Sequence, residues 1–383
     1  MSDPSAQSRP GAGTPERVLL AGGGSAGHVS PLLALADALR RRNPGIRIEV
    51  LGTSTGLEAR LVPDRGYELR TIPKVVFPRR PSAQALRLPS SLWGAVAATD
   101  AVLRDLTPQV VVGFGGYVST PAYLAARRRG IPIVVHEQNA RPGLANKLGA
   151  RLTRHVAVTF ADTPLAHGQV VGMPLRREIS DLNRDELRAQ AREFFGLHPT
   201  RTTLLVTGGS LGAARLNGAF AAAAADLAGP DAPADLQVLH LSGNGKEFEP
   251  VGVQAGRYVV RPYAQRMELA YAAADLVVAR SGANTVCELT AVGLPALFVP
   301  LPIGNGEQRL NAEGVVAAGG ATLTPDDEVD AAWVRSVVVP LLADPRRVAA
   351  MAAASASVGE RHADERLADV VDRAWSAQGE DHR

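Results

Sequence analysis

The chain has 383 residues, of which 46% are hydrophobic and 21% charged. This length predicts two domains of about 150 to 200 residues each, and the composition is typical of a soluble globular protein. One cysteine, Cys287, excludes an internal disulfide and a cysteine-based metal cluster, and a net charge of +3 with 4% aromatic residues argues against a nucleic-acid-binding module.

The sequence predicts neither a signal peptide nor a segment that spans a membrane. Residues 1–16 are rich in Ser, Pro, Gly and Ala and lack an apolar run, which predicts a disordered tail and not a signal peptide. The longest apolar runs, such as 294–303, are interrupted by prolines and fall short of the roughly 20 residues that span a bilayer. Any membrane contact is therefore expected to be peripheral, in a reducing compartment.

Short β-branched runs alternate with Ala-, Leu- and Arg-rich segments of helical period. The predicted strands are 18–21, 46–51, 110–112, 131–135, 203–207, 237–241, 258–260, 276–279 and 296–299. One predicted helix is 213–227, and a last one, about 360–377, could pack on either domain. The alternation predicts an α/β protein with two parallel sheets built from βαβ units.

A domain boundary is predicted near 172–176, where Gly and Pro precede a polar stretch that begins a new helix. The expected organisation is a tail at 1–16, a first domain at 17–175, a second at 176–358 and a C-terminal helical segment at 359–383.

Each half opens with an apolar strand, a glycine-rich turn and a helix. The first turn, Gly22 to His28, matches the dinucleotide-binding pattern G-x-G-x-x-G, but a nicotinamide enzyme usually places an acid at the end of the second strand. Leu51, Gly52 and Thr53 stand there instead, and His28 puts a titratable ring at the helix mouth. A backbone site for an anion or sugar, or a tight turn with a surface histidine, are both compatible with this loop.

The segment 280–288, RSGANTVCE, lies between a predicted strand and a helix. Ser281, Gly282 and the first helical N–H groups suit phosphate oxygens, and Glu288 could accept two ribose hydroxyl hydrogens. A glutamate near a helix start also favours the helix dipole without any ligand. The position of the segment 280–288 at the carboxyl end of a strand favours the interpretation that it binds a ligand.

Three further polar clusters follow predicted strands, at 113–119, 136–143 and 306–312. Each could be ordinary capping, and His136 alone could be a structural histidine. Together they are expected to line one edge of two facing sheets, with a cleft between the domains as the default site.

The ordered series GGGSAGHVSP, GFGGYVSTPAYLAA, GIPIVVHEQNARPGLAN, GGSLGAARLN, RSGANTVCE, GLPALFVPLP and EQRLNA resembles the MurG family, the UDP-GlcNAc transferases that convert lipid I to lipid II in peptidoglycan synthesis. It covers nearly the whole chain. The resemblance implies the GT-B architecture of two facing Rossmann-like domains with an interdomain cleft, the donor mainly on the second domain and the lipid acceptor on the first.

The resemblance also implies roles for single residues. Those on the acceptor and sugar side are Ser25, Ala26, Gly27 and Asn139. Those near the diphosphate are Arg176 and Ser210. Those around uridine and ribose are Ala264, Ala283, Asn284, Thr285, Val286, Cys287 and Glu288, and Gln308 holds the sugar from the opposite rim. Other matches to functional family positions are His28, Tyr117, His136, Glu137, Asn146, Asn217 and Arg280.

Three positions depart from the family pattern. Ala26 stands where the loop often has glycine, Met173 where Asn commonly precedes the linker proline, and Glu307 where Gln or His is frequent. These departures concern fine donor contacts more than the reaction. Cys287 is by itself a small packing residue.

The implied reaction moves GlcNAc from UDP-GlcNAc, a co-substrate, to the muramoyl 4-hydroxyl of an undecaprenyl-diphosphate-linked acceptor, with inversion. Without a DxD-type carboxylate pair, the charge of UDP must be met by helix N-termini, backbone N–H groups and Arg176, so we expect no cofactor and no essential metal. His28 is the first candidate for the base and Glu137 the second. A UDP-GlcNAc epimerase of the same architecture is the nearest alternative, and a nicotinamide oxidoreductase a more distant one.

A basic stretch lies at 69–99, which contains no acidic residue. Its cations are Arg70, Lys74, Arg79, Arg80 and Arg87. The apolar residues interleaved with them, which the prediction places on the same surface, are Val75, Val76, Phe77, Leu86, Leu88, Leu92 and Trp93. This pattern predicts a docking surface for an anionic membrane, at the cytoplasmic face given the implied lipid acceptor. The alternative is an amphipathic helix with its apolar side in the core. Partners from cell division or wall synthesis are implied by the resemblance alone.

Overall fold

The computed structural model describes the backbone of residues 14–75, 83–209, 213–302 and 305–381. The chain forms two compact units, residues 1–176 with 362–383, and residues 177–361. Arg176, placed at the start of the second domain by sequence, is thus the last residue of the first unit before the chain crosses over. Ser210 lies outside the described residues.

The first unit contains a parallel sheet in the order β3-β2-β1-β4-β5-β6-β7. Its strands are β1 Arg17–Ala21, β2 Arg47–Gly52, β3 Glu68–Thr71, β4 Val110–Gly113, β5 Ile133–Glu137, β6 His155–Val158 and β7 Gly168–Val170. Its helices are α1 Ala26–Arg42, α2 Glu58–Asp64, α3 Ala83–Leu106, α4 Ser119–Arg128, α5 Leu144–Gly149 and α16 Ala363–Asp381.

Successive residues of β1 point to opposite faces of this sheet, as a strand requires. Val18 and Leu20 pack in a core with α1 and α16, whereas Leu19 and Ala21 pack in a second core with α3 and α4. Both faces are therefore covered, which explains why the central strands read as continuous apolar runs.

The second unit contains a parallel sheet in the order β10-β9-β8-β11-β12-β13. Its strands are β8 Thr202–Thr207, β9 Leu236–Leu241, β10 Tyr258–Arg261, β11 Leu276–Ala279, β12 Ala296–Phe298 and β13 Ala321–Leu323. Its helices are α6 Arg177–Ser180, α7 Arg184–Phe195, α8 Ala214–Ala222, α9 Ala224–Ala228, α10 Met267–Ala273, α11 Ala283–Ala291, α12 Glu307–Ala317, α13 Ala331–Trp333, α14 Val339–Leu342 and α15 Pro345–Ser357, with a 3-10 turn at Asp326–Glu328 and a π-helical turn at Val334–Val338.

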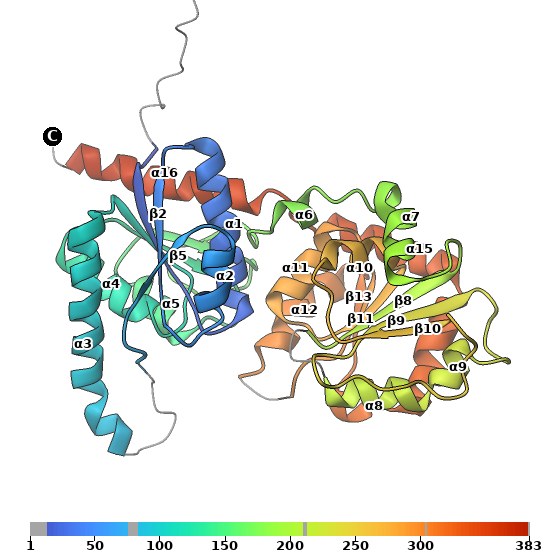
Figure 1. Cartoon of the computed structure of the whole chain (residues 1–383). Coiled ribbons are helices and arrows are strands. Elements are labelled where there is room, and N and C mark those ends of the chain that lie inside the picture. The colour runs from blue at the N-terminus through green and yellow to red at the C-terminus, as the bar shows by residue number, and fades with distance from the viewer. Residues whose placement is uncertain (1–13, 76–82, 210–212, 303–304, 382–383) are drawn as a thin grey trace, which may run out of the picture. The chain divides into compact units, whose positions relative to one another are not determined.

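The C-terminal helix α16 belongs to the first unit, where it lies beside α1 (Figure 1). Leu367 and Val371 enter the core shared with α1. Arg42 forms ion pairs with Glu365, Asp369 and Asp372 of α16 at 2.8 to 2.9 Å. The chain therefore returns to its first domain after completing the second, a choice that sequence had left open.

Two details differ from the sequence predictions. Residues 14–16, assigned to the tail, lie against the first unit, since the Glu16 N–H donates to Gln109 Oε1 at 2.5 Å. The helix predicted at 213–227 is two helices, because the backbone leaves the helical conformation at Ala223. The apolar spacing continues across this break, with Phe220 and Leu227 both buried, so periodicity could not reveal it.

Candidate functional site

In each sheet the strand order reverses beside its first strand. The reversal lies between β1 and β4 in the first unit and between β8 and β11 in the second. In open parallel sheets, ligands bind outside the carboxyl ends of the strands at such a switch point. The loop 22–25 follows β1 in the first unit, and Arg280 to Gly282 follow β11 in the second.

Ser25, Ala26, Gly27 and His28 form the beginning of α1. Ser25 occupies the N-cap position but makes no side-chain capping bond, and its hydroxyl lies 3.1 Å from Nδ1 of His28. The same ring nitrogen lies 3.2 Å from the carbonyl oxygen of Gly23. Burial lowers the pKa of His28, although the charges of Glu137 and Glu58 and the Gly23 carbonyl oppose the shift. The ring is therefore neutral near pH 7 and able to accept a proton.

The loop after β4 comes close to this histidine. A Cβ added at Gly115 would lie 3.3 Å from Nε2 of His28 and 3.4 Å from Nδ2 of Asn146. Gly116 approaches the other loop more tightly, because a Cβ there would lie 2.6 Å from the carbonyl oxygen of Gly23. Both glycines have positive φ. Three loops, after β1, β4 and β5, thus converge at the first switch point.

Glu137 is buried at the end of β5 and holds the loop that follows it. Its carboxylate accepts hydrogen bonds at 3.0 Å from the N–H groups of Asn139 and Gly143 and from the side-chain amide of Asn146. Asn146 in turn accepts from the Tyr123 hydroxyl at 2.8 Å. These three bonds commit the Glu137 carboxylate to the loop, so the geometry favours a positioning role for it over that of the base.

Two other predicted residues of the first unit are next in sequence to Glu137 and Gly116. His136 is fully buried and bonds the Gly172 carbonyl oxygen and Gln138, and burial lowers its pKa to about 4. It is a structural histidine, as the sequence left open. Tyr117 is partly exposed in the loop before α4, with Nζ of Lys74 5.2 Å from its ring centre.

The second switch point carries Glu288, one turn into α11. Gly282 is the N-cap of this helix and has no side chain with which to cap the first N–H groups. Glu288 Oε2 accepts a hydrogen bond of 2.7 Å from the Tyr271 hydroxyl of α10. Tyr271 is a partner of Glu288 that sequence reasoning missed, because nothing local connects residues 17 positions apart.

The remaining predicted residues of this unit make well-defined contacts. Arg280 pairs with Asp326 at 2.6 Å and donates to the Val299 carbonyl at 3.0 Å. Gln308 Oε1 accepts from the Leu301 N–H at 2.9 Å. The implied uridine-side residues Ala264, Ala283, Asn284, Thr285, Val286 and Cys287 lie in the loop before α10 or within α11, where burial raises the pKa of the Cys287 thiol and keeps it protonated.

Asn217 joins α8 to the end of β9. Its side chain donates to the Ser242 carbonyl at 2.9 Å and lies 3.0 Å from Nε2 of His240, whose Nδ1 lies 2.8 Å from the Tyr258 hydroxyl. This chain of contacts fixes the loop after β9. Arg176 is half-buried at the end of the first unit.

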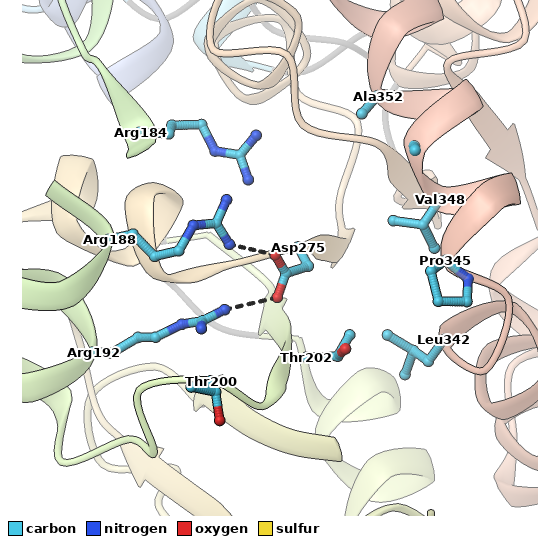
Figure 2. A pocket seen from close by; sticks show the side chains of 11 residues that line it. Arg184, Arg188, Arg192, Thr200, Thr202, Asp275, Leu342, Pro345, Val348 and Ala352 are labelled. Carbon is cyan, nitrogen blue, oxygen red and sulfur yellow. Dashed lines mark hydrogen bonds and ion pairs between the residues drawn. The ribbon is translucent and has the colours of Figure 1, made fainter. Parts of the chain in front are cut away.

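A separate pocket of about 370 Å³ lies between α7 and α15 (Figure 2). It lies at the amino-terminal ends of the strands of the second sheet, where Thr202 begins β8 and Asp275 precedes β11. Asp275 bridges Arg188 at 2.5 Å and Arg192 at 2.9 Å. Ligands of such sheets bind at the carboxyl ends of the strands, which are on the opposite side. We therefore interpret these ion pairs as contacts that hold α7 against the sheet.

Within the described residues, no three His, Cys, Asp or Glu side chains gather into a possible metal site. In the same part of the chain, no helix is long and apolar enough to cross a membrane.

The chain has two Rossmann-like sheets, and in each of them a loop and the start of a helix lie at the switch point. This arrangement is typical of nucleotide-binding α/β proteins, the class to which the GT-B glycosyltransferases belong. The model of the glycosyltransferase family 28 N-terminal domain matches residues 18–158, and that of the family 28 C-terminal domain matches residues 203–367.

Individual relatives are more specific. The chain is 58% identical over 358 residues to the UDP-N-acetylglucosamine–N-acetylmuramyl-(pentapeptide) pyrophosphoryl-undecaprenol N-acetylglucosamine transferase of a Nocardioides species, covering 93% of this chain and 97% of the relative. The crystal structure of Acinetobacter baumannii MurG superposes with a TM-score of 0.75 at 29% identity, covering 94% of this chain and all of that one. The chain belongs to the MurG family of GT-B glycosyltransferases.

The epimerase alternative has weaker support. The UDP-GlcNAc 2-epimerase of Neisseria meningitidis superposes with a TM-score of 0.67 but is 15% identical, over 93% of this chain and 99% of that one. This likeness shows the shared fold alone.

Proposed function

We propose that the protein transfers GlcNAc from UDP-GlcNAc to the 4-hydroxyl of the muramoyl unit of undecaprenyl-diphosphate-linked MurNAc-pentapeptide, which converts lipid I to lipid II. One structural observation carries the proposal: the chain has two separate switch-point sites, with His28 at one and Glu288 at the other. A transferase needs a place for a donor and a place for an acceptor. The family relationship over both domains agrees with this assignment.

In the proposed reaction the second unit holds the donor. The N-terminus of α11, beginning at Gly282, faces the diphosphate with N–H groups and a favourable dipole, and Glu288 accepts hydrogen bonds from the ribose. Arg176 and these backbone donors stabilise the negative charge of the leaving UDP. We therefore propose that turnover needs no metal and no cofactor, and addition of EDTA tests this directly.

The first unit holds the acceptor. The neutral ring of His28 takes the proton of the attacking hydroxyl as its oxygen bonds the anomeric carbon and the bond to UDP breaks. Glu137 supports this step indirectly, because its carboxylate fixes the loop after β5.

Glu288→Gln is expected to weaken UDP-GlcNAc binding about tenfold or more. A neutral amide accepts hydroxyl hydrogens less well, and a hydrogen bond to a charged group is worth about 1.5 to 3 kcal/mol. Isothermal titration calorimetry with UDP-GlcNAc measures the change. Glu268→Gln is the matched control, because Glu268 is a buried carboxylate of the same unit that pairs with Arg266 at 2.7 Å. Unchanged donor affinity in folded Glu288→Gln would remove Glu288 from the site.

We also propose that the protein works at the cytoplasmic face of the cell membrane, where peripheral binding brings it to its lipid-linked acceptor and to partners in wall synthesis or cell division. The support is the acid-free stretch 69–99. Within it, residues 76–82 lie outside the described residues, as do the side chains of 83–87.

The described part of this stretch divides between core and surface. Val75 was predicted to contribute to the docking surface, but it is fully buried in the core with α3 and α4, and Leu88 and Leu92 pack against that core. The prediction for Val75 is therefore wrong, because its apolar side chain completes the packing under α3. Trp93 remains 65% exposed, with the Arg128 guanidinium 5.2 Å from its ring centre.

Changing Arg79, Arg80 and Arg87 together to Glu is expected to abolish most binding to anionic vesicles. Each basic residue near such a surface is worth about 1 kcal/mol. Co-sedimentation with vesicles of anionic phospholipid measures the loss, and any residual binding should depend less on salt.

Reversal of three exposed arginines of the second unit, Arg335, Arg346 and Arg347, is the control and should change binding little. Wild-type binding by the first triple variant would contradict the docking proposal. Both triple variants should still transfer GlcNAc to a soluble short-chain acceptor.

Proton NMR of the purified protein with UDP-GlcNAc separates the two enzyme classes. A transferase should leave the donor intact until a lipid I analogue is added and then release UDP in proportion to product. Conversion of UDP-GlcNAc to its 2-epimer without any acceptor would overturn the proposed function.

A further inference from the structure

One peptide group of the first unit lies between the side chains of His28 and Glu58. The carbonyl oxygen of Gly23 lies 3.2 Å from Nδ1 of His28, and the N–H of Gly24, which belongs to the same peptide group, donates to Oε2 of Glu58 at 2.8 Å. Glu58 and His28 are therefore connected through a single amide plane. The acid that is missing directly after β2 lies further along the chain, because Glu58 is at the beginning of α2.

Glu58 is fully buried, and its carboxylate is surrounded by donors. Besides Gly24, the N–H and hydroxyl of Thr53 donate to Oε1 at 3.0 and 2.7 Å. Burial alone would raise the pKa of this carboxyl, but the hydrogen bonds together hold it below its ordinary value. Glu58 is thus a buried anion at neutral pH, stabilised by bonds that favour its charged form.

Glycines give this carboxylate its space. A Cβ added at Gly23 would lie 2.5 Å from Oε1 of Glu58, and one added at Gly56 would lie 2.0 Å from Oε2. At Gly52, it would lie 2.6 Å from the Glu58 side chain. The loops on both sides therefore approach Glu58 as closely as backbone can, which ties the first glycine-rich loop to α2.

The contact with Gly23 favours a proton on one of the two ring nitrogens of His28. A carbonyl oxygen only accepts, so the favourable arrangement places a hydrogen on Nδ1, where the Ser25 hydroxyl oxygen is a second acceptor at 3.1 Å. Nε2 then carries the lone pair and lies beside Gly115, whose missing side chain leaves room there. The carboxylate on the N–H side polarises the peptide group and strengthens its carbonyl as an acceptor.

We propose that Glu58 is a positioning residue for the base: through the Gly23–Gly24 peptide it holds His28 as the Nδ1–H tautomer, with Nε2 open to receive the proton of the acceptor hydroxyl. The proton transfer rests on the proposed function, whereas the tautomer does not. The acceptor oxygen bonds the anomeric carbon, its proton passes to Nε2, and the bond electrons to the sugar leave with UDP.

The charged groups near His28 all favour the imidazolium that this step forms. Glu58 and Glu137 are both anionic neighbours, and Asn146 and Ser25 are neutral. Glu58 therefore has two effects, since it sets the tautomer before the reaction and stabilises the positive ring after it.

Long-range ¹H–¹⁵N NMR of the histidine ring nitrogens tests the proposal without any substrate. In the wild-type protein at pH 7.5, His28 should show a protonated Nδ1 and a bare Nε2. Glu58→Gln should shift His28 toward a mixture of tautomers, because an amide nitrogen would then face the N–H of Gly24 or Thr53. Turnover should fall about tenfold or more, with little change in the KM for the donor.

Two control variants separate positioning from general damage. Thr53→Val removes one hydroxyl donor but keeps the carboxylate on Gly24, so the tautomer should remain. Glu49→Gln changes another buried carboxylate of the first unit, one that pairs with Arg47 at 2.6 Å, and should leave His28 unchanged.

A wild-type His28 protonated on Nε2 would overturn the proposal, and this measurement needs no variant to fold. A folded Glu58→Gln protein with the wild-type tautomer and turnover would also overturn it, as would equal losses in Glu58→Gln and Glu49→Gln. If His28 has the expected tautomer and depends on Glu58 but the wild-type protein transfers no GlcNAc, the proposed function fails and the positioning by Glu58 stands.

Discussion

His28→Ala is expected to lower turnover about a hundredfold or more while UDP-GlcNAc affinity stays nearly unchanged. Removal of a general base typically costs about 10² to 10⁴ in rate. His28 lies on the first unit, at the start of α1, whereas the proposed donor residues Gly282 and Glu288 lie on the second. Turnover should therefore fall without a matching change in donor affinity. Steady-state kinetics measures the turnover, and calorimetry measures the affinity for UDP-GlcNAc.

The pH dependence gives an independent check on the same residue. Burial lowers the pKa of His28, so the neutral base persists below pH 6.5 and activity should fall only as the pH drops through this lowered value. The acid limb of kcat/KM should disappear from the residual activity of His28→Ala. Normal turnover in the variant would place the base elsewhere, with Glu137 as the next substitution.

Asp275→Asn is expected to destabilise the second unit by about 3 kcal/mol, the lower end of the range for breaking a buried ion pair, because it leaves the buried guanidinium of Arg192 and the partly buried one of Arg188 without a counter-charge. Arg192 has a side chain only 5% exposed and bonds Asp275 at 2.9 Å, and Arg188 bonds the other oxygen. Figure 2 shows both guanidinium groups pointing at this one carboxylate. Urea unfolding followed by tryptophan fluorescence and circular dichroism measures the loss, with the two units fitted as separate transitions.

Asp226→Asn is the matched control for this change. Asp226 pairs with Arg335 at 3.2 Å on the surface of the same unit, with side chains 36% and 51% exposed. Such exposed pairs contribute about 0 to 1 kcal/mol. Equal effects of the two substitutions would contradict the structural role of the cluster around Asp275.

The central strands of both sheets could be predicted because burial on two faces makes them continuous apolar runs. β3, β6, β7 and β13 were not predicted. The residues of β3 Glu68–Thr71 and β7 Gly168–Val170 are exposed or only partly buried and carry no apolar pattern. β6 His155–Val158 and β13 Ala321–Leu323 are runs of four and three residues that each include a polar residue, too short to stand out as strands. α16 was recognised as a helix, but its packing on α1 depends on partners more than 300 residues away, such as Arg42 and Asp372.

In the candidate site, too, some residues could be predicted from the sequence and others could not. The loops at 22–28 and 280–288 were found because glycine, strand and helix signals occur together within a few residues. The partners Glu58 and Tyr271 were missed, because each reaches its target, Gly24 or Glu288, across 34 or 17 residues and only the folded chain shows the contact. Val75 was assigned to the surface from its basic neighbours, yet its side chain lies in the core.

Incubation of the purified protein with labelled UDP-GlcNAc and a short-chain lipid I analogue tests the central claim most directly. We expect one labelled GlcNAc per acceptor, attached through the muramoyl 4-hydroxyl with inverted anomeric configuration, and no transfer to an acceptor in which that hydroxyl is replaced by hydrogen. Absence of labelled product with a folded, UDP-binding protein, or equal transfer to the 4-deoxy acceptor, would contradict the account.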